Sequence, residues 1–281
     1  MEFLKLIRIK DWLKNIIIFF PLIFSGYLFD LSNYSNLVIG FISFSIVSSI
    51  VYILNDILDI ERDKVHPTKK YTKPLASGRI SIKYANFLLI TLIILSIILI
   101  FYQPHISIHL ITYLLINLSY NFIFKKIPYL EFIILSLGYI IRIDTGSQII
   151  NVDSSLLMLV AIFLLGVYFI LRKRISELNH KLELNNYKTR DVLKYYNLKI
   201  LNYFSLTCIF ALLVVSLIYV ILIDFKLILS FLLMSVFLFK YNQLTSITSD
   251  GENPISLITS NRLLLFLSII ILASSTIIYI K

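Results

Sequence analysis

The chain has 281 residues, of which 58% are hydrophobic and only 15% are charged, and its mean hydropathy is +0.88. This composition excludes a soluble domain with a polar surface, because such domains are about 45–50% apolar and about 25% charged. The net charge of +10 does not indicate nucleic-acid binding, because the basic residues stand in short loops between apolar segments and no separate basic domain could hold a duplex.

Nine apolar segments follow one another along the chain. They lie near residues 11–30, 36–56, 84–102, 107–123, 130–150, 155–172, 200–222, 226–244 and 261–280. Most are close to the length of about 20 residues that a helix needs to cross a bilayer, and a helix satisfies its own backbone hydrogen bonds in lipid. We therefore predict an all-α integral membrane protein of about nine transmembrane helices, forming a single domain over residues 1–281.

The basic residues predict the orientation of this bundle. If the N-terminus is cytoplasmic, the cytoplasmic segments are 1–14, 62–83, 125–126, 172–199 and 240–262. Among all Lys and Arg residues, only Arg142, Lys226 and Lys281 then fall elsewhere. The positive-inside rule therefore predicts a cytoplasmic N-terminus and an outside C-terminus.

An acidic stretch follows the second apolar segment and contains Asn55, Asp56, Asp59, Glu61 and Asp63. In a continuing helix all of these except Glu61 share one face, within an arc of about 100°. Clustered carboxylates repel one another unless a cation lies between them, and their oxygens are ligands that Mg²⁺ prefers. We therefore predict that Asp56, Asp59 and Asp63 bind magnesium, which would hold a diphosphate. The alternative is a polar helix end whose acids pair with Arg62, Lys64 and neighbouring lysines.

The acidic stretch resembles the first acidic motif of the UbiA superfamily, whose members share nine transmembrane helices and bind diphosphate substrates through magnesium. The residues from His66 to Lys70 and from Lys73 to Ser81 resemble the branch that includes decaprenyl-phosphate phosphoribosyltransferase. Further blocks resemble that branch in order: Arg8 to Asn15, Tyr120 with Lys125-Lys126, Gly138 to Arg142, Arg172 to Leu178, and Asn253 to Arg262, with Asn261 where an Asp is expected.

The resemblance implies an enzyme that transfers the 5-phosphoribosyl group from phosphoribosyl pyrophosphate to a polyprenyl (decaprenyl-like) phosphate, releases diphosphate and uses Mg²⁺. It also implies a place in the plasma (inner) membrane, an active site at the cytoplasmic face and a role in cell-envelope glycan synthesis. The catalytic residues that it implies are Asp56, Asp59, Asp63 and Lys173. The substrate-binding residues that it implies are Lys14, Asn15, Asn55, His66, Lys69, Lys70, Lys73, Tyr120, Arg142, Arg174 and Glu177.

Several of these residues also allow a structural interpretation. The run of Lys173, Arg174 and Glu177 can be a solvated charge run, although Glu177 can also brace either base along one helix face. Arg142 can be a buried ion contact with nearby Asp144 as its neutralising partner, although residues two apart do not share a helix face. His66 can position its loop rather than bind a metal.

Two other functions remain open. An aromatic prenyltransferase of the same superfamily would use the same acids to hold a prenyl diphosphate, but an aromatic acceptor needs fewer cations than Lys69, Lys70, Lys73 and the second basic motif supply. A lipid or metal-ion transporter would place its acids near the midplane of the membrane rather than at a helix end. No pattern in the sequence fixes whether the protein is a homo-oligomer.

Overall fold

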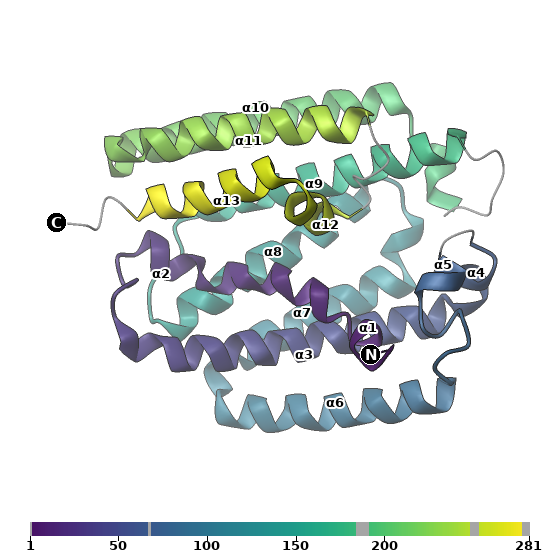
Figure 1. Cartoon of the computed structure of the whole chain (residues 1–281). Helices are drawn as coiled ribbons and strands as arrows, with labels where there is room; N and C mark the ends of the chain where they lie inside the picture. Colours follow the sequence, from purple (N-terminus) through teal and green to yellow (C-terminus); the bar gives the residue numbers. More distant parts are fainter. Residues whose placement is uncertain (1, 67–68, 184–190, 248–252, 277–281) are drawn as a thin grey trace.

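The computed structural model describes residues 2–66, 69–183, 191–247 and 253–276, and every regular element among them is a helix (Figure 1). The elements are α1 (Glu2–Leu6), η1 (Ile9–Phe19), α2 (Phe20–Phe24), η2 (Leu31–Asn33), α3 (Tyr34–Leu58), α4 (Ile60–Lys64), α5 (Lys69–Thr72), α6 (Ile82–Tyr102), η3 (Pro104–Ile106), α7 (Ser107–Phe122), η4 (Phe124–Lys126), α8 (Leu130–Ile149), α9 (Leu156–Glu183), η5 (Asp191–Tyr195), α10 (Leu198–Ile223), η6 (Phe225–Leu227), α11 (Ile228–Ile247), α12 (Pro254–Ser260) and α13 (Arg262–Ser275). The all-α prediction is confirmed.

Five helices among the described residues are long and apolar enough to cross a membrane. They are Leu31–Leu58, Ile82–Tyr102, Leu156–Asn179, Leu198–Ile223 and Phe225–Ser246. Helices α12 and α13, bent by 97° at Asn261, make a sixth if they are counted as one span. The prediction of a helical membrane protein is therefore confirmed.

The other three predicted spans are also helical but fall short of that standard. Residues 9–24 form the 3₁₀ helix η1 and the five-residue helix α2. Helix α7 has 16 residues, about 24 Å at 1.5 Å per residue, which is less than the roughly 30 Å of a hydrocarbon core. Helix α8 has 20 residues but carries Glu131, Arg142 and Asp144. The total of nine crossings stays a prediction for these segments.

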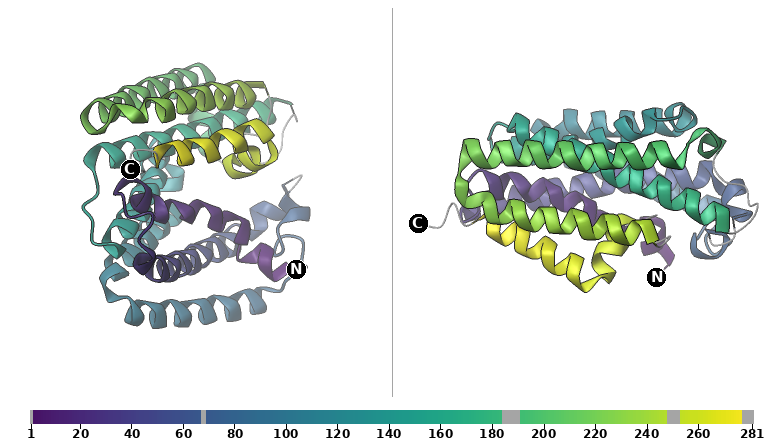
Figure 2. Two further views of the ribbon diagram at one scale, coloured as in Figure 1. Left: turned by 60° about the vertical axis from the view of Figure 1, so that its left-hand side comes forward. Right: turned by 90° about the horizontal axis from the view of Figure 1, so that it is seen from above.

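Helix α3 occupies the interior of the N-terminal half, whereas α6 and α10 form outer walls (Figures 1 and 2). Of the apolar window of the α3 span, 67% is buried inside the protein, against 17% for α6 and 11% for α10. The exposed faces of α6 and α10 are rich in Ile, Leu and Phe, as lipid contact requires.

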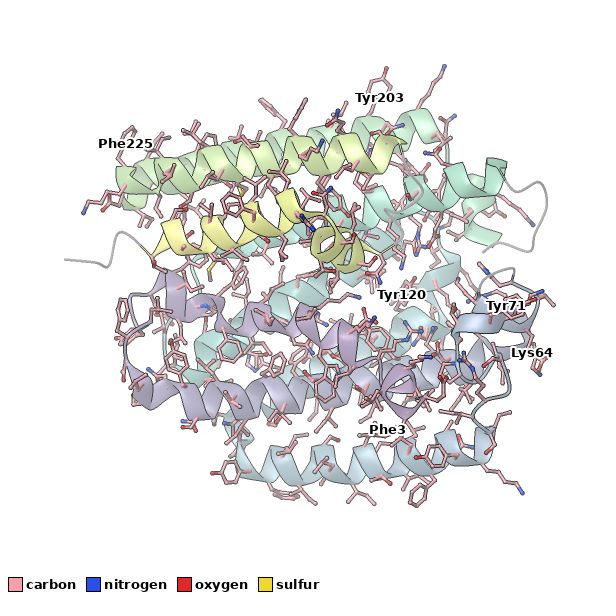
Figure 3. The ribbon with its side chains drawn as sticks, viewed as in Figure 1. Phe3, Lys64, Tyr71, Tyr120, Tyr203 and Phe225 are labelled. Carbon is pink, nitrogen blue, oxygen red and sulfur yellow. The ribbon has the colours of Figure 1, made fainter. Side chains whose placement is uncertain are left out.

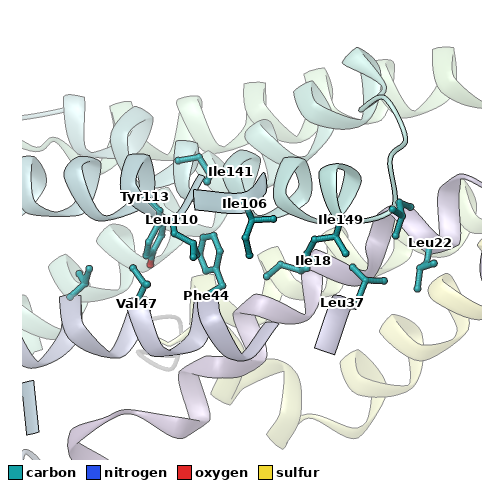
Figure 4. Packing of buried hydrophobic residues seen from close by; sticks show 12 residues of the cluster. Ile18, Leu22, Leu37, Phe44, Val47, Ile106, Leu110, Tyr113, Ile141 and Ile149 are labelled. Carbon is teal, nitrogen blue, oxygen red and sulfur yellow. The ribbon is translucent and has the colours of Figure 1, made fainter. Parts of the chain in front are cut away.

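A buried apolar cluster joins η1, α2, α3, η3, α7 and α8 (Figure 4). Within it the rings of Phe44 and Tyr113 lie 4.6 Å apart, centroid to centroid. Close packing of η1 on α8 depends on Gly146, because a Cβ atom there would lie 2.0 Å from the carbonyl oxygen of Ile18. The cluster fixes η1 beside α3 and α8, and so positions the polar residues of η1.

The two ends of the bundle carry different residues. The α3–α4 junction, Lys64, Tyr71 and the last turns of α9 lie at one end, whereas Phe225 and the end of α13 lie at the other (Figures 1 and 3). This separation agrees with the predicted placement of the basic segments on one side. That this side is cytoplasmic stays a prediction.

Candidate active site

Three buried carboxylates lie where α3 passes into α4. Helix α3 ends at Leu58, and after Asp59 the chain continues as α4. Asp56, Asp59 and Asp63 are 3%, 6% and 1% exposed, whereas the side chain of Glu61 is 81% exposed. The predicted sorting of these acids is therefore confirmed, because helical periodicity turns the three Asp inward and leaves Glu61 outside.

One lysine joins two of these acids. The Nζ atom of Lys73 lies 2.7 Å from Oδ1 of Asp56 and 2.6 Å from Oδ2 of Asp63. The Nη2 atom of Arg8 lies 2.6 Å from the same oxygen of Asp56. Burial by itself would lower the pKa of the Arg8 guanidinium, but the ion pair with Asp56 raises that pKa above its usual value. The guanidinium of Arg8 therefore stays charged beside Asp56.

The third carboxylate, Asp59, is held from two directions. Its Oδ2 atom lies 2.6 Å from Nη2 of Arg62, one turn further along the chain. Its Oδ1 atom lies 3.2 Å from Nζ of Lys125 in η4, which is 66 residues away in sequence. The alternative of a polar helix end, whose acids pair with Arg62, Lys64 and neighbouring lysines, is met only in part. Arg62 pairs with Asp59, but Lys64 pairs with the exposed Glu61.

The chemistry of this cluster fits a magnesium ion. The Oδ1 atom of Asp63 is buried and has no hydrogen-bond partner within the described residues, which is costly unless a donor or cation reaches it. No three His, Cys, Asp or Glu side chains of the described part of the chain are grouped as a metal site, and the ammonium of Lys73 lies between Asp56 and Asp63. An ion on these carboxylates therefore requires Lys73 to move aside.

The loop after α4 carries further predicted residues. The Nδ1 atom of His66 accepts a hydrogen bond from the backbone N–H of Lys69 at 3.3 Å, which supports its interpretation as a loop-positioning residue. Lys70 Nζ lies 4.7 Å from the ring centroid of Tyr71. Lys69, Lys70 and Asn55 are half-buried.

Helix η1 presents Lys14 and Asn15 to the interior. The Nζ atom of Lys14 lies 2.7 Å from Oδ1 of Asp11 and 5.8 Å from the ring centroid of Tyr52. Asn15 is fully buried and donates to the hydroxyl of Ser45 at 2.9 Å. Its fixed position makes its remaining oxygen available to α8.

Arg142 of α8 binds that oxygen, with its Nε atom 2.7 Å from Oδ1 of Asn15. Its Nη1 atom donates to the carbonyl of Gly138 at 2.6 Å, and its Nη2 atom donates to the hydroxyl of Tyr113 at 3.0 Å. These partners are neutral, and among the described residues no carboxylate contacts Arg142.

The structural alternative in which Asp144 neutralises Arg142 is not met. Residues two apart on a helix point to different sides, and Asp144 instead lies 2.9 Å from Nε2 of His109 and accepts from Ser154 at 2.9 Å. Arg142 is therefore held by dipoles and aromatic rings rather than by an ion pair with its neighbour.

Arg174 lies in a separate buried cluster with Glu131. Its Nε atom lies 2.7 Å from Oε1 of Glu131, its Nη2 atom contacts Oε2 of Glu131, and its Nη1 atom contacts Glu177. The hydroxyls of Tyr196 and Tyr120 donate to Glu131 at 2.7 and 3.1 Å, and Tyr120 lies inside the bundle in Figure 3. The predicted bracing of Arg174 by Glu177 is confirmed, and this guanidinium is already neutralised within the protein.

Lys173, beside Arg174, is half-buried and lies within electrostatic reach of Asp11 in η1. Arg174, by contrast, is directed toward Glu131 of α8.

Sequence reasoning missed four residues of these clusters as site members, namely Arg8, Lys125, Glu131 and Tyr196. Glu131 could have been found as an ionisable residue within an apolar segment. Arg8 and Lys125 stood in blocks that carried the family resemblance, but nothing in their spacing indicated contact with Asp56 and Asp59.

Comparison with known proteins gives a family and two named relatives. Residues 17–270 match the UbiA prenyltransferase family. Over 166 residues the chain is 29% identical to decaprenyl-phosphate phosphoribosyltransferase of Corynebacterium glutamicum, a match that covers 57% of this chain and 50% of that protein. Over 180 residues it is 28% identical to the protein of the same name from Mycobacterium tuberculosis, covering 62% and 59%. The matched part thus spans less than two thirds of either relative.

Among solved structures, the fold is similar to that of a UbiA homolog from Archaeoglobus fulgidus bound to DMAPP and Mg²⁺. The TM-score is 0.72, the sequence identity is 16%, and the match covers 99% of both chains. At this identity the likeness shows a shared fold.

Proposed function

The chain belongs to the UbiA prenyltransferase family, and we propose that this membrane transferase moves the 5-phosphoribosyl group of phosphoribosyl pyrophosphate to a polyprenyl phosphate. One observation carries the proposal: the buried carboxylates of Asp56, Asp59 and Asp63 are held by partly exposed cations that can turn to a phosphate-bearing substrate. The two relatives named as decaprenyl-phosphate phosphoribosyltransferases support this choice of donor and acceptor.

In this proposal Asp56 and Asp63 hold magnesium, with Asp59 beside them. The buried, unpartnered Oδ1 atom of Asp63 supports this assignment, as does the binding of Mg²⁺ with DMAPP by the homolog from Archaeoglobus fulgidus. When bound, magnesium supplies positive charge to the departing diphosphate.

The surrounding cations bind the donor. Lys73 moves from Asp56 and Asp63 to a diphosphate oxygen, and Arg8 and Lys125 neutralise further phosphate charge. Lys173, which lies within electrostatic reach of Asp11 in η1, is assigned to the second phosphate-bearing substrate. In this proposal the cations serve two phosphorylated substrates rather than one diphosphate and an aromatic acceptor.

The reaction exchanges one bond for another at the anomeric carbon of the ribose. An oxygen of the lipid phosphate forms the new C–O bond as the bond to diphosphate breaks, and diphosphate leaves with the bonding electron pair. The acceptor phosphate is already ionised near neutral pH, so that no strong base is required. The task of the protein is therefore positioning and charge stabilisation.

An apolar cavity of about 360 Å³ offers a place for the polyprenyl tail. Its walls come from η1, α2 and α9–α13, and include Phe20, Phe169, Tyr219, Phe231 and Ile271. A lipid tail in this cavity would hold its phosphate toward the polar end of the bundle. We propose that this end is cytoplasmic and that the enzyme works in the plasma membrane in cell-envelope glycan synthesis.

A second function is favoured by the fold relative alone, since that protein binds the prenyl diphosphates DMAPP and GPP with Mg²⁺. On this alternative the carboxylates hold a prenyl diphosphate, and an aromatic acceptor attacks the allylic carbon. Asp56, Asp59 and Asp63 could hold either diphosphate, but on this alternative Lys173 would have no second phosphate to bind.

The test follows radiolabel from phosphoribosyl pyrophosphate into lipid, using purified protein, Mg²⁺ and polyprenyl phosphate. We expect labelled lipid with the wild type, and at least a ~100-fold lower rate with Asp56→Asn and Asp63→Asn, as for loss of a main electrostatic stabiliser. Glu61→Gln is the matched control, because it removes an exposed carboxylate from the same helix end and should keep the wild-type rate. Transfer of a prenyl group to a hydroxybenzoate acceptor, without use of phosphoribosyl pyrophosphate, would establish the alternative.

A further inference from the structure

Arg172 lies on α9 two residues before Arg174, and therefore about 200° around the helix from it. It is 1% exposed and faces α10 and α11, away from the carboxylates of α3 and α4. No carboxylate of the described side chains contacts it. Burial of a cation without a counter-ion is costly, so Arg172 differs sharply from Arg174, which is paired with Glu131.

The contacts of Arg172 are all with neutral groups. Its Nε atom donates to Thr245 at 2.7 Å, and Nη2 donates to Ser246 at 2.8 Å. Two longer contacts join Nη1 to Asn202 at 3.2 Å and Nη2 to the carbonyl of Asn242 at 3.3 Å. A guanidinium has five N–H donors, so one of them is unassigned among these contacts and two others are only weakly engaged.

These groups line a polar cavity of about 340 Å³ between α9, α10 and α11. Its walls include Arg172, Asn179, Asn202, Leu206, Asn242 and Ser246, with no acidic residue among them. The Oδ1 atom of Asn242 is buried without a partner within the described residues. Rotating that amide by 180° would place its NH₂ group there instead, which an anion in the cavity would favour.

We propose that this cavity is a binding site for a phosphate group, carried by an anionic lipid headgroup or by a soluble phosphate. The planar fork of Arg172 suits the oxygens of a phosphate, and the amides of Asn179, Asn202 and Asn242 supply neutral donors around it. A bound phosphate removes the cost of the uncompensated charge. The site is formed by α9–α11 and is separate from the carboxylate cluster of α3 and α4, and it requires no part of the proposed transfer reaction.

The surroundings give such a ligand access from the membrane. Leu206 in the wall is 53% exposed, and Tyr203, one turn earlier on α10, is 69% exposed and projects from the outer wall in Figure 3. The cavity thus lies under a lipid-facing surface, at the end of the bundle where α9 carries its basic residues.

The experiment measures binding in EDTA, so that the carboxylate cluster holds no magnesium. In neutral detergent, inorganic phosphate and pyrophosphate are titrated by calorimetry. In nanodiscs that contain equal amounts of phosphatidylglycerol and phosphatidylcholine, the lipids retained by the protein are counted by native mass spectrometry. Arg172→Gln is compared with Lys199→Gln, which removes an exposed charge at the same end of α10.

We expect Arg172→Gln to weaken binding at least about tenfold, as loss of a charged hydrogen-bonding group does, while Lys199→Gln binds as the wild type does. Loss of soluble phosphate binding identifies a soluble ligand, and loss of phosphatidylglycerol enrichment alone identifies a headgroup. If Arg172→Gln does not fold, Asn202→Ala, which keeps the guanidinium, should weaken binding about threefold to fivefold. The proposal is overturned if the wild type binds neither ligand, or if neither cavity variant changes the binding.

Discussion

The carboxylate cluster at the end of α3 and the Arg174–Glu131 cluster on α8 and α9 both pair acids with bases, but they differ in how tightly they are closed. Around Asp56, Asp59 and Asp63 the cationic side chains are 17% to 31% exposed. In the other cluster both partners are 1% exposed. The first group can exchange its cations for a substrate, whereas the second cannot open without leaving a charge buried. This difference in exposure, rather than in charge, is why we propose that the first cluster binds substrate and that the second has a structural role.

The largest expected effect comes from a substitution in the Arg174–Glu131 cluster, which we call the closed cluster. Glu131→Gln removes one of the two carboxylates that neutralise the buried Arg174, the other being Glu177, and loss of one partner of a buried pair costs about 3–5 kcal/mol. We expect the free energy of unfolding, measured by chemical unfolding in detergent micelles, to fall by about 3 kcal/mol. The control Glu61→Gln, which removes an exposed partner of Lys64, should lose less than about 1 kcal/mol. Equal stability of the two variants would contradict a structural role for the closed cluster.

A smaller effect is expected for Mg²⁺ binding at Asp56, Asp59 and Asp63, which form the open cluster. Because Lys73 contacts both Asp56 and Asp63, it competes with any metal for their oxygens. In Lys73→Gln the Mg²⁺ concentration that gives half of the maximal rise in unfolding temperature should fall about tenfold, since a nearby like charge has been removed. The measurement uses no substrate, and Lys64→Gln is the control. A higher Mg²⁺ requirement in Lys73→Gln would mean that Lys73 does not occupy a cation site.

The smallest effect is expected for Lys173 and tests whether this residue binds substrate or belongs to the closed cluster. Lys173 stands next to the Arg174–Glu131 cluster in sequence but lies within electrostatic reach of Asp11 in η1. Lys173→Gln should raise the KM for polyprenyl phosphate about fivefold, as loss of a charge-assisted hydrogen bond does. Stability should change by less than in Glu131→Gln. An unchanged KM together with a large loss of stability would place Lys173 with the structural cluster, and Lys199→Gln controls for the loss of charge.

The part of the site that the sequence predicts well is the local part. The inward face of Asp56, Asp59 and Asp63 and the outward position of Glu61 follow from one helical repeat, which needs no knowledge of the rest of the fold. The same is true of the contact between Arg174 and Glu177, which lies within one turn of α9.

Contacts between distant segments could not be predicted in this way. Arg8 reaches Asp56 across 48 residues, and Arg174 reaches Glu131 across 43. Arg174 is neutralised by Glu131 within the protein, and its contact with a substrate phosphate stays a prediction. The contact of Asp144 with His109, 35 residues away, is likewise one between distant segments.

Helix α8 also constrains how the chain enters the bilayer during synthesis. Each of its charged residues opposes insertion, by about 2.5–3.5 kcal/mol for Arg or Asp at the centre of a helix. Arg142 and Asp144 find partners in η1 and α7, at Asn15, Tyr113 and His109. These segments have already left the ribosome when α8 emerges.

Glu131 depends on a segment that is made later. The guanidinium of Arg174 that neutralises it belongs to α9 and follows 43 residues further along the chain. The hydroxyl of Tyr120, which also binds this carboxylate, comes from the preceding helix. We therefore expect α8 to wait at the insertion machinery and to pass into lipid together with α9, as a helical pair whose charges cancel.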